Sequence, residues 1–187
     1  MTKIVIGIDE VGRGCLAGPV WAAAVALGQN PGLREQVRDS KALSRKRREL
    51  LAEAILRDCR VGFGEASVVE IDRLNIRLAT HLAMVRAVNA LSAHGDISLI
   101  VDGNDIPEKL RKFDARCVVG ADALVPEVSA ASIVAKVGRD ALMSDLAREF
   151  PAYGWERNAG YGTVEHRRAI RCHGLTPWHR RSFSMGI

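Results

Sequence analysis

Two adjacent acidic residues, Asp9 and Glu10, stand near the start of the chain and are followed at once by Gly12, Arg13 and Gly14. Two neighbouring carboxylates repel each other, so a positive partner has to make the arrangement tolerable. The glycines leave the backbone open to close approach by a ligand. The stretch therefore indicates a ligand site built from acidic side chains and accessible main chain.

Two further acids follow apolar stretches that are typical of buried strands. Asp102 follows residues 97–101, and Asp122 follows residues 115–121. The ends of neighbouring strands in an α/β sheet are where ligands usually bind. Carboxylates gathered there need a cation, and their hard oxygens suit Mg²⁺ or Mn²⁺ better than zinc. Two such ions about 4 Å apart form a clamp for in-line attack on a phosphodiester.

The neighbouring positions of Asp9 and Glu10 raise a geometric difficulty. Adjacent residues of a strand point to opposite faces of the sheet. The two acids can therefore share a site only if the strand twists or ends beside them. Gly12 and Gly14 favour such a local break, and we expect the strand to end there.

A polar line runs along one side of the long helix that residues 126–150 predict. Ser129, Ser132, Lys136 and Asp140 are spaced by three, four and four positions, so they share one helix face. The line is either a solvent face with small packing residues or a surface that meets phosphate groups. The pattern alone leaves both interpretations open.

Two shorter motifs are ambiguous when each is taken alone. Residues 39–44, DSKALS, contain Ser40 and Lys41 and are typical of an ordinary segment before a helix. Residues 160–163, GYGT, place Tyr161 between two glycines. Such a ring is either packed in a turn or exposed, where it could stack on a sugar or base.

The remaining pattern predicts an α/β fold with a mixed sheet flanked by helices. Strands are expected at 3–9, 20–27, 60–68, 97–103 and 115–120, the first two antiparallel and the third carrying glycine bulges. Helices are expected at 44–57, 70–93, 126–150 and 163–174. Leu50, Leu51, Ala54 and Ile55 define the predicted buried face of the first helix.

Composition limits the class of protein. The chain has 187 residues, 48% of them hydrophobic, which fits a single globular domain. The net charge is +5, and residues 151–187 hold six Arg and two Glu, so this stretch is either a solvated basic tail or a surface that faces phosphate. The four cysteines form no C-x-x-C pair and no apolar run is long enough to span a membrane, which predicts a soluble cytoplasmic protein with free thiols.

Together these stretches resemble the ribonuclease HII family, the type 2 ribonuclease H of bacteria. The matching pieces occur in the order of the family and extend from residue 7 to residue 183. They are GIDEVGRGCLAGPV, DSKALS, VDGN, VPEVSAASIVAKVGRD, GYGT with His166 after it, and HRRSF.

The resemblance implies a ribonuclease H-like fold, with one catalytic domain over residues 1–187 and a small basic helical part at about 150–187. It implies a monomeric endoribonuclease that cuts the RNA strand of RNA–DNA hybrids and nicks duplex DNA at single ribonucleotides. The expected reaction is two-metal hydrolysis with Mg²⁺ or Mn²⁺, which leaves 3′-hydroxyl and 5′-phosphate ends.

The resemblance also assigns roles to individual residues. The metal-binding acids of the family correspond to Asp9, Glu10, Asp102 and Asp122. Main-chain groups of Gly12, Arg13 and Gly14 are expected to read the ribose 2′-hydroxyl, which distinguishes RNA from DNA. Tyr161 is expected to stack near the sugar at the RNA–DNA junction. Phosphate contacts are expected from Ser40, Lys41, Ser132 and Lys136.

The chain departs from the family pattern around Asp122. Gly120 and Ala121 stand where the family commonly has Lys and Gly, and Ala123 and Leu124 follow where a basic or hydroxyl residue is common. These differences predict a weaker phosphate contact there. Val11 and Cys15, where the family often has Ala and Pro, are tolerable. Two alternatives stay open: a hybrid-binding protein without catalysis, and a metal-dependent phosphodiesterase that cuts DNA.

Overall fold

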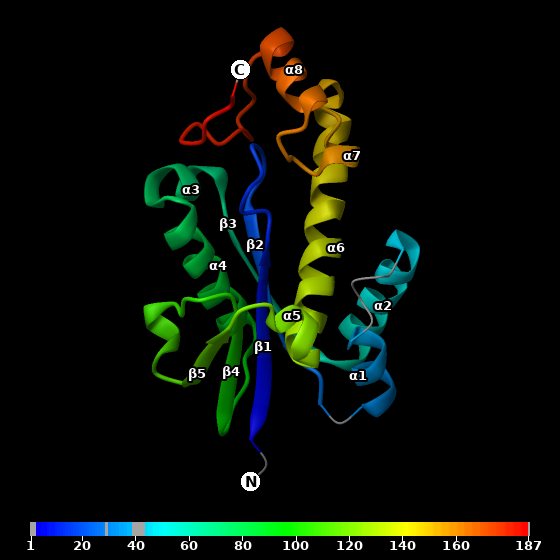
Figure 1. Ribbon diagram of the computed structural model, residues 1–187, viewed down its shortest axis with the longest axis vertical. Helices are drawn as coiled ribbons and strands as arrows, with labels where there is room; N and C mark the ends of the chain where they lie inside the picture. Colours follow the sequence, from blue (N-terminus) through cyan, green and yellow to red (C-terminus); the bar gives the residue numbers. More distant parts are fainter. Residues whose placement is uncertain (1–2, 29, 39–43, 187) are drawn as a thin grey trace.

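The computed structural model describes residues 3–28, 30–38 and 44–186. Its centre is a five-stranded mixed sheet of order β3-β2-β1-β4-β5, in which β1 is antiparallel to β2 and parallel to β4 (Figure 1). The strands are β1 Ile4–Val11, β2 Val20–Ala26, β3 Arg60–Ala66, β4 Ile97–Asp102 and β5 Asp114–Val118. The predicted mixed sheet and the antiparallel pairing of its first two strands are therefore confirmed.

Helices cover both faces of this sheet. In Figure 1, α3 and α4 lie on one side of the strands, α1, α2 and α6 lie on the other, and α7 and α8 lie at the end of the molecule away from the N-terminus. The helices are α1 Pro31–Arg38, α2 Arg45–Asp58, α3 Val68–Leu74, α4 Ile76–Leu91, α5 Ala121–Leu124, α6 Pro126–Glu149, α7 Trp155–Asn158 and α8 Val164–His173, and the 3₁₀ turns are η2 Glu108–Leu110 and η3 Pro151–Tyr153. Helices α1, α5 and α7 were not predicted from the sequence.

The alternation of side chains along β1 separates two hydrophobic cores. Ile6 and Ile8 are fully buried against the α4 side of the sheet. On the other face, Gly7 lies against α6, and a Cβ atom at this position would be 2.1 Å from the carbonyl carbon of Glu127. The close approach of α6 to the strand therefore requires glycine at position 7. This contact fixes where α6 begins relative to the acids at the far end of β1.

The helix predicted at 70–93 is two helices, so this prediction was wrong. α3 ends at Leu74 and α4 begins at Ile76, because Asn75 between them has a φ of 72°. The Asn75 side chain accepts a hydrogen bond from the Leu78 N–H at 3.1 Å and so caps α4. Ser67 and Glu70 form a capping box that starts α3.

The glycines of β3 do not form the predicted bulges. Pairing with β2 is continuous from Val20 opposite Ala66 to Ala26 opposite Arg60. A Cβ atom at Gly62 would lie 2.2 Å from the carbonyl oxygen of Ala87, and the backbone of α4 crowds Gly64 in the same way. The glycines therefore let α4 approach the sheet closely.

Two smaller expectations about helices have mixed outcomes. Ser44, where the predicted helix starts, caps α2, and its hydroxyl accepts a hydrogen bond from the Arg47 N–H. The predicted buried face is wrong at one position, because Leu50 is 56% exposed while Leu51, Ala52 and Ile55 are buried.

Within the described part of the chain, no helix is both long enough and apolar enough to cross a membrane.

Candidate active site

β1 ends at Val11, directly before Gly12, so the break that the glycines favour is present, one residue beyond the acidic pair. The strand continues to Val11, which pairs with Trp21 of β2. Because Glu10 has the same parity as Ile8, it lies on the α4 face of the sheet, and Asp9 lies on the α6 face. The two acids therefore flank the strand instead of pointing in one direction.

Asp9 is a carboxylate in a poorly solvated position. It is 6% exposed, and its Oδ1 accepts a hydrogen bond from the Glu10 N–H at 2.7 Å. Burial raises the pKa of Asp9 to about 7, the Ser132 hydroxyl opposes this by donating a hydrogen bond, and the charges of Glu10 and Asp102 raise the pKa further. The mutual influence shows that three of the predicted acids lie within electrostatic reach of one another.

Glu10 has one paired oxygen and one unpaired oxygen. Its Oε1 accepts a hydrogen bond from Arg13 Nη1 at 3.1 Å, so Arg13 supplies the positive partner that the acidic pair requires. Its Oε2 is buried and has no hydrogen-bond partner. Burial raises the pKa of Glu10, and Arg13 opposes that effect. A buried carboxylate oxygen without a partner is costly unless a ligand satisfies it.

Asp102 lies at the end of β4, beside the acids of β1. The parallel register pairs Ile8 with Val101, so Asp102 and Asp9 each follow the last pair of these neighbouring strands. Asp102 Oδ1 accepts a hydrogen bond from the Ala121 N–H at 2.7 Å. A small cavity on the α4 side is lined by Glu10, Arg13 and Asp102, among other residues.

Asp122 lies on α5, one residue beyond the N–H group that binds Asp102. Its carbonyl oxygen accepts a hydrogen bond from the Ser129 hydroxyl, which also donates to the Val125 carbonyl. Ser129 is 1% exposed, so it anchors α5 to α6 and is not part of a solvent face. α5 is therefore held close to the end of β4.

The acids suit a hard divalent cation in chemical type. All four offer carboxylate oxygens, and the unpaired Glu10 Oε2 and the buried Asp9 would both be stabilised by positive charge. Over residues 3–28, 30–38 and 44–186, however, no group of three or more His, Cys, Asp or Glu side chains is already spaced to hold a metal ion. Asp102 directs one oxygen at the Ala121 N–H, so binding requires adjustment of side chains.

The Gly12–Gly14 loop follows β1, and a buried arginine fixes it by hydrogen bonds to its carbonyl groups. Arg180 is 0% exposed, and its Nη2 and Nη1 donate to the carbonyls of Gly12 at 2.7 Å and Arg13 at 2.9 Å. Gly12 has a φ of 92°, and a Cβ atom there would lie 2.2 Å from Arg139 Nε. A Cβ atom at Gly14 would have no other atom within 4 Å, so this glycine faces open space.

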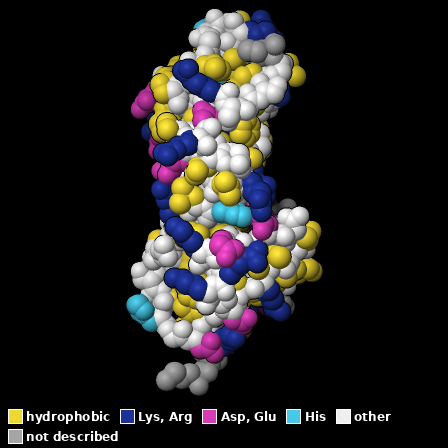
Figure 2. Space-filling model, turned by 90° about the vertical axis from the view of Figure 1, so that its left-hand side faces the viewer, with side chains coloured by type: hydrophobic (Ala, Val, Ile, Leu, Met, Phe, Trp, Pro, Cys, Tyr) yellow, Lys and Arg dark blue, Asp and Glu magenta, His cyan; other side chains and the backbone are white. Residues whose placement is uncertain are grey.

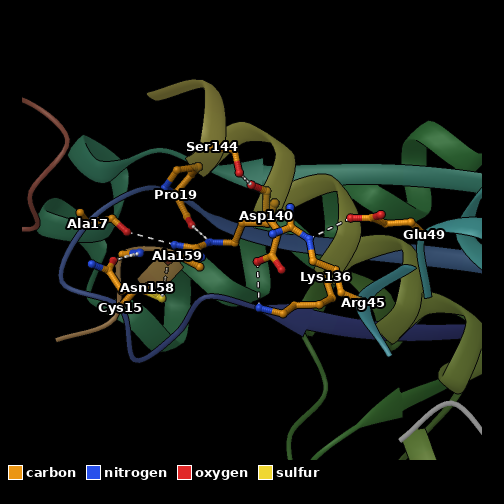
Figure 3. A network of polar contacts seen from close by, with 12 residues as sticks. Cys15, Ala17, Pro19, Arg45, Glu49, Lys136, Asp140, Ser144, Asn158 and Ala159 are labelled. Atoms are coloured by element: carbon orange, nitrogen blue, oxygen red, sulfur yellow. Dashed lines mark hydrogen bonds and ion pairs between the residues drawn. The ribbon is translucent and has the colours of Figure 1, made fainter. Parts of the chain in front are cut away.

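A second buried arginine, Arg139 of α6, ties three loop carbonyls together. Its guanidinium donates to Pro19 at 2.9 Å, to Ala159 at 2.8 Å and to Ala17 at 3.0 Å, and Figure 3 shows these carbonyls gathered beside α6. The buried role of Arg139 was not predicted from the sequence. Its spacing of four positions from both Ala135 and Met143 places it on an apolar helix face, and this spacing could have indicated a buried arginine. Arg139 and Arg180 are both fully buried, although arginine is rarely buried unless its guanidinium is paired.

Tyr161 lies next to the Gly12–Gly14 loop. It forms an isolated bridge with Cys15, and the residue is 42% exposed. Its carbonyl oxygen is 2.9 Å from Nδ1 of the buried His166. The fold thus brings together two segments whose proximity the sequence does not reveal, and His166 and His179 behind them are further residues for which the sequence predicted no role.

The polar line on α6 is divided between two settings. Ser132 donates to Asp9, whereas Lys136 forms an ion pair with Asp140 at 2.8 Å (Figure 3). Lys136 is therefore half-buried on the helix surface, one turn beyond the residue that contacts Asp9. Ser40 and Lys41 lie outside the described residues.

Positive side chains are not confined to the C-terminal end of the molecule. Figure 2 shows Lys and Arg side chains spread along the face that carries α3 and α4, with acidic side chains between them. The six arginines of residues 151–187 also differ in exposure, since Arg180 is fully buried. The C-terminal charge is therefore partly structural.

A family model described as Ribonuclease HII matches residues 6–185. The match covers nearly the whole chain, including both acidic strand ends, the Gly12–Gly14 loop and Tyr161. The chain belongs to the ribonuclease HII family. It has the ribonuclease H-like fold and the activity of that family, which is metal-dependent endoribonuclease cleavage of RNA–DNA hybrids and of DNA at embedded ribonucleotides.

Similar proteins support this membership. The chain is 54% identical over 186 residues to ribonuclease HII of Sphingopyxis alaskensis, covering 98% of this chain and 90% of that protein. It is 56% identical over 189 residues to ribonuclease HII of Paramagnetospirillum magneticum, covering 97% and 90%. Among solved structures, the PCNA:RNase HII complex from Archaeoglobus fulgidus matches with a TM-score of 0.82 and 31% identity, over 97% of this chain and 95% of that chain.

Proposed function

We propose that Asp9, Glu10, Asp102 and Asp122 form the catalytic centre and hold Mg²⁺ or Mn²⁺. The observation that carries this proposal is the unpaired, buried Glu10 Oε2 beside two further carboxylates at the ends of β1 and β4. When bound, divalent ions activate water and stabilise the leaving oxygen of a phosphodiester, which yields 3′-hydroxyl and 5′-phosphate ends.

The protein groups around this centre have separate tasks. Ser132 keeps the Asp9 carboxylate in place by a hydrogen bond, and the Ala121 N–H does the same for Asp102. Arg13 holds Glu10 on the α4 side of the sheet, so a substrate phosphate that draws Arg13 away would free the second carboxylate oxygen. These hydrogen bonds hold the negatively charged carboxylates near one another in spite of their repulsion.

Substrate recognition is assigned to the two loops that meet at Cys15 and Tyr161. Main-chain groups of Gly12–Gly14 read the 2′-hydroxyl, for which the open space at Gly14 leaves room. The half-exposed Tyr161 ring stacks on the sugar at the junction. Ser132 and Lys136 on α6, with Ser40 and Lys41, contact phosphates, and residues 150–187 complete the substrate-binding part of a single, monomeric catalytic domain.

The direct test is cleavage of duplex DNA that contains one ribonucleotide, in the presence of Mg²⁺ or Mn²⁺, with the nick mapped at nucleotide resolution. An all-DNA duplex of the same sequence is the control, and cutting of that duplex would favour a DNA phosphodiesterase. Asp102→Asn keeps an oxygen for the Ala121 N–H, so we expect it to fold and bind the duplex but not to cut it. A fully active Asp102→Asn protein would exclude this residue from the centre.

A further inference from the structure

Two histidines that are distant in sequence share a buried cluster behind the Tyr161 loop. His166 of α8 and His179 of the C-terminal segment are 0% and 1% exposed, and their Nε2 atoms are 3.1 Å apart. Trp155 and Tyr153 pack around them. Burial lowers the pKa of both imidazoles, that of His179 to about 4, so both rings are neutral at pH 7.

The proton position on His179 follows from a backbone contact. The Thr176 N–H donates to His179 Nδ1 at 2.9 Å. A backbone N–H can only donate, so Nδ1 carries the lone pair, and the proton of the neutral ring is on Nε2. That proton points at Nε2 of His166.

The proton position on His166 follows in the same way. The Trp155 indole N–H donates to His166 Nε2 at 3.0 Å, and indole has no acceptor. His166 Nε2 therefore accepts from both Trp155 and His179, and the ring proton lies on Nδ1. This Nδ1–H donates to the Tyr161 carbonyl at 2.9 Å.

The donors thus form a chain with one direction, from the Thr176 N–H through both imidazoles to the Tyr161 carbonyl. A second proton on either ring would sit on the nitrogen that now accepts a hydrogen bond, so it would face the N–H group that donates to that nitrogen. The Tyr161 carbonyl also accepts the Thr163 N–H at 2.8 Å, so two donors fix its main chain while the residue remains 42% exposed. Packing alone would not require a defined tautomer for each ring.

We infer that His166 is a positioning residue for Tyr161 in recognition of the ribonucleotide junction, and that His179 and Trp155 hold it in the Nδ1–H tautomer. This inference rests on the role assigned to Tyr161 under the proposed function. His166 itself has no exposed surface, so it acts through the Tyr161 main chain and not on the substrate.

Two substitutions of similar polarity separate this role from core packing. In His166→Asn, the side-chain amide occupies the place of Nδ1 and retains a donor to the Tyr161 carbonyl. In His166→Gln, the amide reaches the place of Nε2 and loses that donor. We expect single-turnover nicking at a lone ribonucleotide to be about tenfold slower in His166→Gln than in His166→Asn, as for loss of one positioning hydrogen bond. Equal rates in the two variants would overturn the inference.

A double-mutant cycle with Tyr161→Ala tests whether His166 acts through Tyr161. Because the ring is already missing, we expect His166→Gln to slow nicking no further in the Tyr161→Ala background. A further tenfold loss there would contradict the inference. Tyr161→Ala with the wild-type rate would overturn both the recognition role of Tyr161 and the inference, whereas a slow Tyr161→Ala beside an unaffected His166→Gln would overturn the inference alone.

The tautomers can also be measured in the unmodified protein, which removes any dependence on the folding of the variants. Ring ¹⁵N chemical shifts distinguish protonated from unprotonated imidazole nitrogens. At pH 7 we expect His166 to be protonated at Nδ1 only and His179 at Nε2 only. A His166 ring protonated at Nε2 would rule out the donor to Tyr161 and the inference with it.

Discussion

Replacement of Asp9 by asparagine should stabilise the metal-free fold. The pKa of Asp9 is raised from 3.8 to about 7, chiefly by burial, so the folded state holds its proton more tightly than the unfolded chain. The stability that the protonated form gives is complete below pH 3.8 and is lost as the pH rises through 7. Above pH 7 the fold therefore carries the full cost of the buried charge.

The cost can be worked out from the two pKa values. A pKa difference of about 3 units, at about 1.4 kcal/mol each, gives about 4 kcal/mol at pH 8. Asn keeps an oxygen for the Glu10 N–H and removes the charge, so Asp9→Asn should recover most of this energy. Ser132 can bond to either side chain.

Urea unfolding in EDTA measures the effect. We expect the free energy of unfolding of Asp9→Asn to exceed that of the wild type by about 2–4 kcal/mol at pH 8, and the gain to shrink toward zero at pH 4. Asp58→Asn is a control, because the exposed Asp58 has its pKa lowered by Arg57 and its loss should give no gain. Equal stability at pH 8, or the same gain at both pH values, would refute the reasoning.

Metal ions should narrow this difference in stability. A ligand that binds the folded state stabilises it by mass action. Saturating Mn²⁺ in place of EDTA should therefore raise the stability of the wild type more than that of Asp9→Asn at pH 8. An equal response of the two proteins to Mn²⁺ would argue against Asp9 as a ligand, independently of any activity measurement.

Two glycine substitutions should affect different properties, one the stability of the fold and the other the rate of cleavage. Gly7→Ala places a Cβ atom 2.1 Å from the backbone of Glu127, so it should lower the free energy of unfolding by about 3 kcal/mol or more in urea titrations, and near wild-type stability would contradict the contact. The methyl group of Gly14→Ala meets no atom within 4 Å, so this variant should unfold like the wild type. It should nick a lone ribonucleotide at least about tenfold more slowly, because the methyl group fills space that the substrate occupies. An unchanged nicking rate would show that the substrate does not occupy the space beside Gly14.

The sequence predicts the sheet and the long helix well because their signals are local. Apolar runs mark β1 and β4, and Pro126 marks the start of α6, where its missing N–H costs nothing. The break between α3 and α4 escaped prediction because the helical spacing of apolar residues continues through it. Only Asn75, with its positive φ and its capping side chain, interrupts the backbone.

At the candidate site, the sequence predicts where acids follow strands but not how their side chains point. The glycines mark the end of β1, but Val11 before them still pairs with Trp21, so Asp9 and Glu10 stay within the strand and point to opposite faces. The contacts that fix the Gly12–Gly14 loop could not be predicted from local sequence patterns. Arg180 donates to Gly12 across 168 residues of sequence, and no spacing pattern reports such a contact.

This long-range contact has a consequence for the timing of activity during synthesis. The Gly12–Gly14 loop is made near the start of translation, but the guanidinium that fastens its carbonyls comes from Arg180. Asp72 also accepts the N–H groups of Arg181 and Ser182, which anchors this late segment. A nascent chain still attached to the ribosome can therefore fold its sheet early, yet it acquires a fixed loop only when translation has passed this segment.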